Sequence, residues 1–264
     1  MIKLVVSDID GTLLSEGTTK VKLELFEIIR ELKARGVMFA AASGRQYASM
    51  RHVFAPVAND IIFIAENGTN VMCREQNISS RYIDEGAAKE LVRFMREQKD
   101  TEIILSTPKK MYFESKKPGF EELLTGYGNV VQRTDDLLQH CARTNKISAY
   151  RSYGIEELCA QIKDRFADRL NIAIAGAIWV DTMSLDADKG NAIAEIQKMM
   201  KITKEETMAF GDNCNDMGML RQAGESYAVA NAHPQLKESA KHIAPPQSED
   251  GVLQVLRGLL AGEL

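Results

Sequence analysis

Hydrophobic and polar positions in the first third of the chain alternate between short apolar runs and longer amphipathic segments. Residues 2–7 (IKLVVS), 37–42 (VMFAAA) and 61–65 (IIFIA) are apolar runs of strand length. Residues 20–35 carry apolar side chains at nearly helical spacing, and Gly36 follows where a helix C-cap belongs. Strand, helix and strand in this order predict a right-handed βαβ unit in a parallel sheet.

The last third of the chain repeats this rhythm. The pattern predicts alternating helices and strands near residues 191–200, 207–210, 215–222, 226–229 and 251–261. We therefore expect both ends of the chain to form one α/β core, a doubly wound parallel sheet of Rossmann-like type.

The middle of the chain has an α+β pattern instead. Helices are expected near 85–98, 118–125 and 155–166, and strands near 102–106, 111–114, 146–150, 170–175 and 178–183. A segment of about 100 residues is long enough to have a core of its own. We therefore predict a core made of residues 1–83 and 186–264, and an inserted α+β domain made of residues 84–185.

Composition narrows the classes of partner. The chain has 264 residues, of which 45% are hydrophobic, and a formal net charge of -4, so it lacks the basic surplus of a nucleic-acid-binding domain. The N-terminal apolar run is too short for a secretory signal, and no stretch approaches the roughly 18 apolar residues of a membrane helix. The four cysteines are scattered without zinc-site spacing. We expect a cytoplasmic protein with no nucleic-acid or membrane partner; the oligomeric state is not indicated.

The sequence DIDGT, Asp8 to Thr12, directly follows the first strand. Side chains alternate along an extended chain, so Asp8 and Asp10 project to the same side and repel each other unless a cation is present. Mg²⁺ suits such a site because it takes a few oxygen ligands and leaves room for a phosphate. Asp8 could then attack phosphorus, and Asp10 could protonate the leaving oxygen and later deprotonate water. Taken alone, the motif also fits an acidic turn that caps a helix.

Two further segments offer groups that can bind an anion such as phosphate. Ser43 and Gly44, in the SGR sequence after the second strand, offer a hydroxyl and backbone N–H groups at a helix N-terminus, which is an anion site or an ordinary N-cap. Lys189 opens a helix, on the unfavourable side of the helix dipole. A phosphate or Asp8 would offset that cost; a solvated surface lysine is the alternative.

The last polar cluster lies in GDNCNDMGM, after the strand at 207–210. Asp212, Asn215 and Asp216 provide carboxylates and an amide, while Cys214 and Met217 exclude an EF-hand loop. Three of the four polar motifs follow directly on predicted parallel strands, and ligands of open α/β sheets bind at the carboxyl ends of strands. The sequence thus predicts one site where carboxylates, a metal, a hydroxyl and a lysine converge.

These four motifs, in this order, resemble those of the haloacid dehalogenase-like superfamily, and the layout is similar to its Cof-type phosphatases with a class IIB cap. The resemblance covers essentially the whole chain, the cap by position and coarse pattern alone. It implies that Asp8 is the nucleophile and Asp10 the general acid and base. It further implies phosphate binding by Ser43, Gly44, Lys189 and Asn215, and Mg²⁺ binding by Asp8, Asp10, Asp212 and Asp216.

Two more segments match signatures of that superfamily. AENGT (65–69) resembles the element after the third strand, and the Asn231–Ala232 pair followed by Asp250–Val252 resembles the C-terminal element. Gln46 departs from the pattern, since many relatives carry proline there. This difference concerns the rigidity of the loop.

The resemblance implies a Mg²⁺-dependent phosphatase for small-molecule phosphate monoesters, with sugar phosphates expected and an aspartyl-phosphate intermediate. A phosphomutase or other phosphotransferase on the same core, and a non-catalytic phospholigand sensor, remain alternatives. A receiver domain would lack the inserted domain. The sequence contains neither the GxxxxGK[ST] of a P-loop kinase nor the GxGxxG of a Rossmann dehydrogenase.

Overall fold

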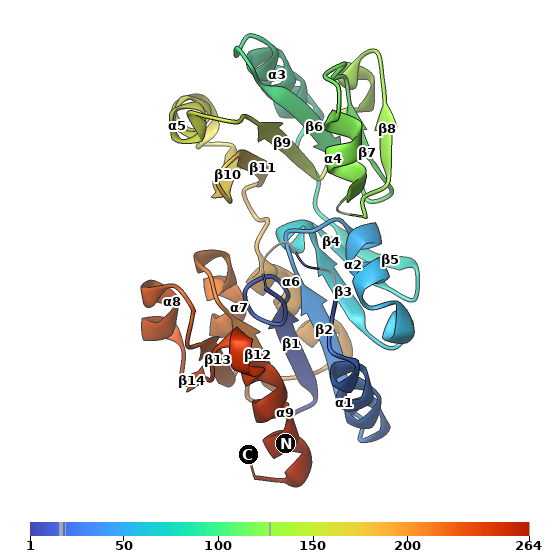
Figure 1. The fold of residues 1–264 in the computed structure, drawn as a ribbon, viewed down its shortest axis with the longest axis vertical. Helices are drawn as coiled ribbons and strands as arrows, with labels where there is room; N and C mark the ends of the chain where they lie inside the picture. Colours follow the sequence, from blue (N-terminus) through green and yellow to red (C-terminus); the bar gives the residue numbers. More distant parts are fainter. Residues whose placement is uncertain (16–17, 19, 127, 264) are drawn as a thin grey trace. The chain divides into compact units, whose positions relative to one another are not determined.

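The chain forms two compact units in a computed structural model that describes residues 1–15, 18, 20–126 and 128–263. The core unit comprises Met1–Arg45, Met50–Ile78 and Asp188–Leu264, and the inserted unit comprises Gln46–Ser49 and Ser79–Ala187 (Figure 1). The core unit is therefore built from both ends of the chain.

The core unit contains an eight-stranded sheet with the order β14-β13-β12-β1-β2-β3-β4-β5. Neighbouring strands from β14 to β3 run parallel, and β4 is antiparallel to β3. The strands are β1 (Leu4–Asp8), β2 (Met38–Ala42), β3 (Ile62–Ala65), β4 (Asn70–Cys73), β5 (Gln76–Ser80), β12 (Thr207–Gly211), β13 (Glu225–Val229) and β14 (His242–Ala244). This arrangement confirms the predicted α/β class with a parallel core sheet.

The central strand β1 is buried along its whole length, as expected for a parallel strand covered on both faces. Its register pairs Asp8 with Ala42 of β2 and Ser7 with Phe210 of β12. The loops that follow these three strands therefore start at the same edge of the sheet. The helices of the core unit are α1 (Leu23–Ala34), α6 (Lys189–Met200), α7 (Met217–Arg221), α8 (Pro234–Ser239) and α9 (Gly251–Ala261), and the chain passes from the inserted unit back into the core unit within α2 (Tyr47–Val53).

The inserted unit has a six-stranded sheet with the order β10-β11-β9-β6-β7-β8, antiparallel except for the β7–β8 pair. Its strands are β6 (Glu102–Ser106), β7 (Met111–Phe113), β8 (Val131–Arg133), β9 (Lys146–Tyr150), β10 (Leu170–Ala175) and β11 (Trp179–Ser184), and its helices are α3 (Glu85–Arg96), α4 (Phe120–Gly126) and α5 (Ile155–Phe166). Helices α3 and α5 pack on the sheet in one hydrophobic cluster, and α4 packs in a second.

The elements that the pattern did not predict are short, and most of the missed strands are exposed. Strands β5, β8 and β14 lie at the edges of their sheets, and most of their side chains are exposed or half-buried. A strand with little buried surface has no apolar run, so periodicity does not detect it. Helices α2 and α8 have seven and six residues, about two turns each.

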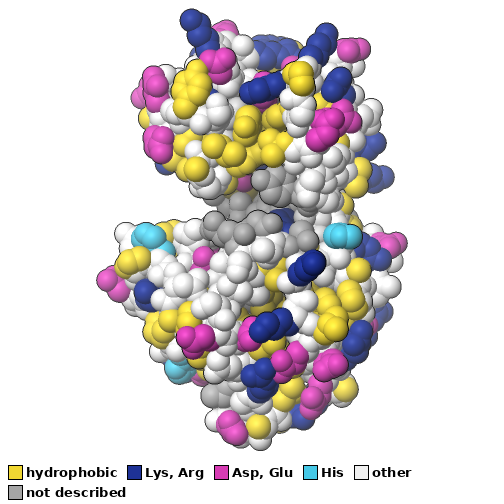
Figure 2. Space-filling view, in the orientation of Figure 1, with side chains coloured by type: hydrophobic (Ala, Val, Ile, Leu, Met, Phe, Trp, Pro, Cys, Tyr) yellow, Lys and Arg dark blue, Asp and Glu magenta, His cyan; other side chains and the backbone are white. Residues whose placement is uncertain are grey.

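Acidic and basic side chains are interspersed on the face shown in Figure 2, and no single sign dominates there. This agrees with the small net charge of -4. None of the helices in the described part of the chain is long and apolar enough to cross a membrane.

Candidate active site

A buried lysine joins two carboxylates at the carboxyl edge of the core sheet. Asp8 ends β1, Lys189 begins α6, and Asp216 follows β12. Lys189 Nζ lies 2.5 Å from Asp8 Oδ1 and 2.7 Å from Asp216 Oδ1, and its side chain is fully buried. Burial tends to lower the pKa of the Lys189 ammonium, but the charges of Asp216 and Asp8 outweigh it and raise that pKa. The two carboxylates thus provide the partner that a lysine at a helix N-terminus needs.

The start of α6 is built to hold this lysine. Asp188 is the N-cap residue, and its carboxylate accepts hydrogen bonds from the backbone N–H groups of Gly190 at 2.7 Å and Asn191 at 3.2 Å. Gly68 has φ +93°, and a Cβ there would lie 2.4 Å from the Asp188 carbonyl oxygen. The AENGT segment therefore turns directly against the helix end that carries Lys189.

Asp216 organises the loop after β12. Its Oδ2 accepts hydrogen bonds from the backbone N–H groups of Asp212 and Asn213, both at 3.0 Å, while its Oδ1 accepts from Lys189. Both carboxylate oxygens are thus engaged within the protein. This geometry favours a role for Asp216 in holding Lys189 and the loop.

Asp8, Asp212 and Asp216 place carboxylate oxygens within 4.8 Å of one another. Burial raises the pKa of Asp8 well above its usual range, and the charges of Asp216 and Asp212 add to this effect against the opposing charge of Lys189. Burial, followed by the charge of Asp216, raises the pKa of Asp212 to about 6. The cluster holds three carboxylates and one buried lysine, so its negative groups outnumber the cation that the chain provides. Its oxygen donors therefore fit a hard divalent cation.

Asp10 lies outside this cluster and pairs with Arg45. Arg45 Nε donates to Asp10 Oδ2 at 2.8 Å and its Nη2 donates to Oδ1 at 2.5 Å, while Nη2 also donates to the Thr18 carbonyl at 2.8 Å. Ser43 Oγ lies 3.5 Å from Asp10 Oδ2. Such a two-pronged contact fixes the orientation of a carboxylate. No role was predicted for Arg45; the parallel pairing of β1 with β2 ends at Asp8 and Ala42, so the residues that follow each strand start side by side.

The segments that are expected to bind phosphate contact each other through Asn67. Its backbone N–H donates to the Ser43 carbonyl at 2.9 Å, and its side-chain oxygen accepts from Asn215 Nδ2 at 3.1 Å. A Cβ on Gly44 would lie 3.3 Å from the Asn67 side chain. The structure therefore brings Ser43, Gly44 and Asn215 together through Asn67, a residue of the AENGT segment for which no role was predicted.

The C-terminal element holds the DIDGT turn. Asn231 Nδ2 donates to the Gly11 carbonyl at 2.9 Å, and its Oδ1 accepts from the Gln247 backbone N–H at 2.8 Å. Gly11 has φ +83°, and a Cβ there would lie 2.3 Å from Asp212 Oδ2. Thr12 Oγ1 donates to Asp212 Oδ1 at 2.9 Å. The turn after β1 and the loop after β12 are therefore in direct contact.

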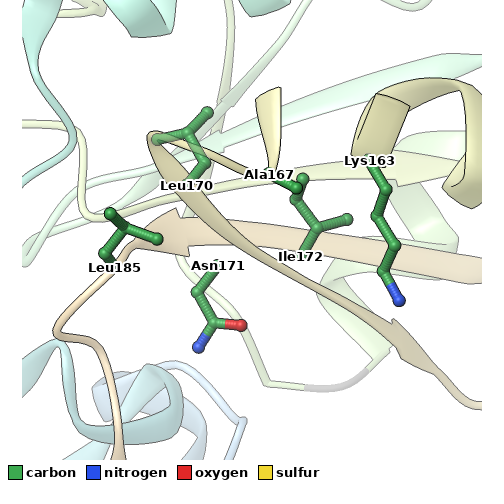
Figure 3. Close-up of a pocket in the computed structure, with 6 residues that line it drawn as sticks. All are labelled: Lys163, Ala167, Leu170, Asn171, Ile172 and Leu185. Carbon is green, nitrogen blue, oxygen red and sulfur yellow. The ribbon is translucent and has the colours of Figure 1, made fainter. Parts of the chain in front are cut away.

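A cavity of about 380 Å³ in the inserted unit has a different lining. Figure 3 shows its six residues, which come from α5, β10 and their neighbourhood: Lys163, Ala167, Leu170, Asn171, Ile172 and Leu185. This lining includes one charged side chain, a lysine, and no carboxylate. It therefore lacks the groups that the acidic cluster of the core unit provides.

The family model for haloacid dehalogenase-like hydrolases matches residues 5–256, so the chain belongs to that family. Together with the acidic site, this makes the protein an enzyme of the phosphatase class, since its named relatives are phosphatases of the same family.

Similar proteins cover nearly the whole chain. The 5-amino-6-(5-phospho-D-ribitylamino)uracil phosphatase YbjI of Escherichia coli (strain K12) is 28% identical over 99% of this chain and 97% of its own. A crystal structure of a protein from Eubacterium rectale has 31% identity and a TM-score of 0.90, covering 98% and 99% of the two chains. The HAD subclass IIB sugar phosphatase BT4131 has the same fold, with 22% identity, a TM-score of 0.80, and coverage of 97% and 98%.

Proposed function

We propose that this protein is a Mg²⁺-dependent phosphatase that hydrolyses small-molecule phosphate monoesters, with sugar phosphates as its main substrates, through an aspartyl-phosphate on Asp8. The observation that carries the proposal is the fully buried Lys189 between Asp8 and Asp216, at 2.5 and 2.7 Å, beside the carboxylate of Asp212. A buried cation beside a carboxylate at a strand end can neutralise a phosphoryl group and orient the nucleophile.

In the proposed reaction, a carboxylate oxygen of Asp8 attacks phosphorus and the bond from phosphorus to the ester oxygen breaks. Lys189 holds Asp8 through Oδ1, which fixes the orientation of the second oxygen. Asp10 donates a proton to the departing oxygen and then takes one from the water that hydrolyses the acyl phosphate. Ser43, the Gly44 backbone and Asn215 would bind the phosphoryl oxygens, as the resemblance implies.

Asp8, Asp212 and the backbone carbonyl of Asp10 would hold Mg²⁺, with Asp216 supporting them through its bonds to the loop. When bound, the ion supplies positive charge that compensates the carboxylates and the phosphoryl oxygens. The acidic cluster supports this assignment, because Asp8, Asp212 and Asp216 place three carboxylates around one buried lysine and leave negative charge for a divalent cation to compensate.

We further propose that the inserted unit acts as a cap that contacts the leaving group, and that the enzyme works in the cytoplasm. All four cysteines are free, which suits a reducing compartment. The names of the relatives support the substrate class: YbjI acts on a ribityl phosphate, and BT4131 is named a sugar phosphatase.

The proposal is tested by measuring phosphate release from a panel of sugar, polyol, nucleotide and flavin phosphates, with Mg²⁺ and with EDTA. We expect Mg²⁺-dependent release of one phosphate per ester consumed. Formation of an isomeric sugar phosphate without free phosphate would instead indicate a mutase. Binding of phosphate esters without turnover would indicate a sensor.

We expect Mg²⁺ to raise the melting temperature more at pH 7.5 than at pH 5. The pKa of Asp212 is about 6 in the folded metal-free protein, against an ordinary value of 3.8. Between these two pKa values the folded protein therefore binds more protons than the unfolded protein. The contribution of Asp212 to the stability of the metal-free protein is fully present below the ordinary pKa of 3.8, and it is lost as the pH rises through about 6. Mg²⁺ binds the ionised carboxylates and restores that stability, with an expected shift of several degrees at pH 7.5.

Differential scanning fluorimetry with Mg²⁺ or EDTA at both pH values measures this difference. Asp60→Asn, which alters an aspartate that pairs with Lys33, should keep the wild-type dependence on Mg²⁺ and pH. An equal shift at pH 5 and pH 7.5 would contradict the assignment of the cation to these carboxylates.

Arg45→Met should lower kcat for a sugar phosphate by about 10- to 100-fold, because Asp10 loses its two-pronged partner and with it a fixed orientation for proton transfer. p-Nitrophenyl phosphate has a good leaving group that needs little protonation, so its kcat should decrease less. Steady-state kinetics on both substrates measure the difference, with Arg51→Met as the control because Arg51 pairs with Glu75 instead. Equal losses on the two substrates would argue against a role through Asp10.

A further inference from the structure

The sheet of the inserted unit has an unpaired apolar edge at β10. This strand is the first in the order β10-β11-β9-β6-β7-β8, and it pairs with β11 on one side (Figure 1). In the described part of the chain, no strand pairs with its other side. Its six residues, LNIAIA, include neither a charged side chain nor a proline. The backbone N–H and C=O groups along such an edge are a template for a further strand.

The other three sheet edges in the described chain carry features that discourage pairing. Strand β14 has three residues and is followed by Pro245 and Pro246, and β8 has three residues and includes Arg133. Strand β5 has the mostly polar sequence QNISS. Strand β10 is the longest of the four edge strands and has none of these features. This contrast singles out β10 as the edge that can accept a partner strand.

A cavity of about 380 Å³ lies at this edge, between β10 and the end of α5. Lys163 and Ala167 line it from α5 and its C-cap, and Leu170, Asn171 and Ile172 line it from β10 (Figure 3). Neighbouring residues of a strand project to opposite faces of the sheet. A cavity that touches both Asn171 and Ile172 therefore follows the edge of the strand, where a second strand and its side chains would lie.

We propose that β10 pairs with the β10 strand of a second copy of this chain, antiparallel and around a two-fold axis at Ala173. In this register Ile172 lies opposite Ile174 of the partner subunit, and the two inserted sheets form one continuous sheet. Leu170 and Ile172 belong to the hydrophobic cluster that packs with α5, so Ile174 projects to the same face. Ile174 is 43% exposed in the single chain, and the partner's Ile172 would cover it.

The charges on α5 favour a second copy as the partner. The connection from α5 to β10 is short, so the helix and the strand run antiparallel. Lys163 lies beside Ile172 in the lining of the cavity, and Glu156 lies two helical turns away, about 10 Å along the helix and near the level of Ala175. The two-fold axis at Ala173 therefore places Lys163 of each copy opposite the partner's Glu156. Neither side chain has an ion-pair partner among the residues that the structure describes.

The helices also have the spacing and the side chains that such a pairing needs. Helix α5 contacts both β10 and β11, so its axis lies about 5 Å, or one strand spacing, from the proposed two-fold axis. The α5 helices of the two copies would then lie about 10 Å apart, which is a distance at which helices pack. Ala160 and Ala167 lie on the same face of the helix as Glu156 and Lys163, and all four side chains are exposed. The small alanines leave room for the second helix.

Sedimentation equilibrium of the full chain over a range of concentrations tests the proposal. We expect a monomer–dimer equilibrium with a Kd in the micromolar range. Ile174→Lys should raise this Kd at least about tenfold, because the two-fold axis brings two lysines into the apolar centre of the interface. Ile243→Lys is the matched control, since Ile243 is a 52% exposed isoleucine on the edge strand β14 of the core sheet. It should keep the wild-type Kd.

A charge exchange tests the register and does not depend on the Ile174 variant. Lys163→Glu and Glu156→Lys should each raise the Kd about tenfold, because each turns two symmetry-related attractions into repulsions, and the double variant should recover the wild-type Kd. Hydrogen exchange of the amides in residues 170–175 should slow as the concentration of the wild type rises.

The outcomes that overturn the proposal are distinct. A wild-type chain that remains monomeric at every concentration shows that this edge does not pair with a second copy. A dimer that survives Ile174→Lys, or that Ile243→Lys weakens equally, uses another surface. A double variant that is as weak as the single variants rules out the two-fold register at Ala173. None of these measurements uses a phosphate ester, so their results are independent of the phosphatase function proposed above.

Discussion

Asp8→Asn should abolish turnover, with kcat at least about 10⁴-fold below that of the wild type, because an amide cannot attack phosphorus to form the covalent intermediate. The fold should persist. Asparagine matches the shape of this side chain, and Lys189 keeps its ion pair with Asp216. Single-turnover and steady-state assays of phosphate release measure the loss, and circular dichroism checks the fold.

Two observations complete this test. Wild-type enzyme that is quenched in acid during turnover should carry a phosphoryl group on Asp8, which peptide mass spectrometry detects, whereas Asp8→Asn should carry none. Asp60→Asn should turn over like the wild type, because Asp60 pairs with Lys33 away from the cluster. Wild-type turnover by Asp8→Asn would show that catalysis does not proceed through this residue.

Lys189→Met should destabilise the metal-free protein by about 3–5 kcal/mol, the range expected when one member of a buried ion pair is removed. The Lys189 side chain is fully buried and contacts both Asp8 and Asp216, so its loss leaves two buried carboxylates without their cation. Activity should also fall by about 10²-fold or more, because the phosphoryl group loses a fixed positive charge. Urea unfolding in EDTA measures the first effect, and kcat under saturating Mg²⁺ measures the second.

The matched control is Lys198→Met, on the exposed side of the same helix. It makes the same chemical change without removing a buried charge, so its stability should stay within about 0.5 kcal/mol of the wild type. A Lys189→Met variant as stable as Lys198→Met would mean that the two carboxylates are protonated or solvated in the folded protein, which contradicts the buried ion-pair arrangement.

The fold class followed from periodicity because the buried elements have strong patterns. The helix expected over 251–261 coincides with α9, and the strand over 102–106 coincides with β6. Strands β5, β8 and β14 were not predicted, since an edge strand with exposed side chains has no apolar run to detect it. The family resemblance, confirmed by the match over residues 5–256, rested on four short motifs that needed no coordinates to be read.

The sequence by itself determined the identity and order of the polar groups, because each of the four motifs is a local feature: three follow directly on strands, and Lys189 opens a helix. It did not determine which side chains pair. Three sets of contacts depend on strand register and on loops that bring together segments up to about 150 residues apart. They are the pairing of Arg45 with Asp10, the hydrogen bond between Asn67 and Asn215, and the bonds of Asp216 to Lys189 and to the backbone of its own loop. The same holds for the buried ion pair of Lys146 and Asp181 in the inserted unit, since these residues become neighbours only when β9 and β11 pair. Hydrophobic periodicity specifies which face of an element is buried, whereas the partners of a buried charge are decided by packing in three dimensions.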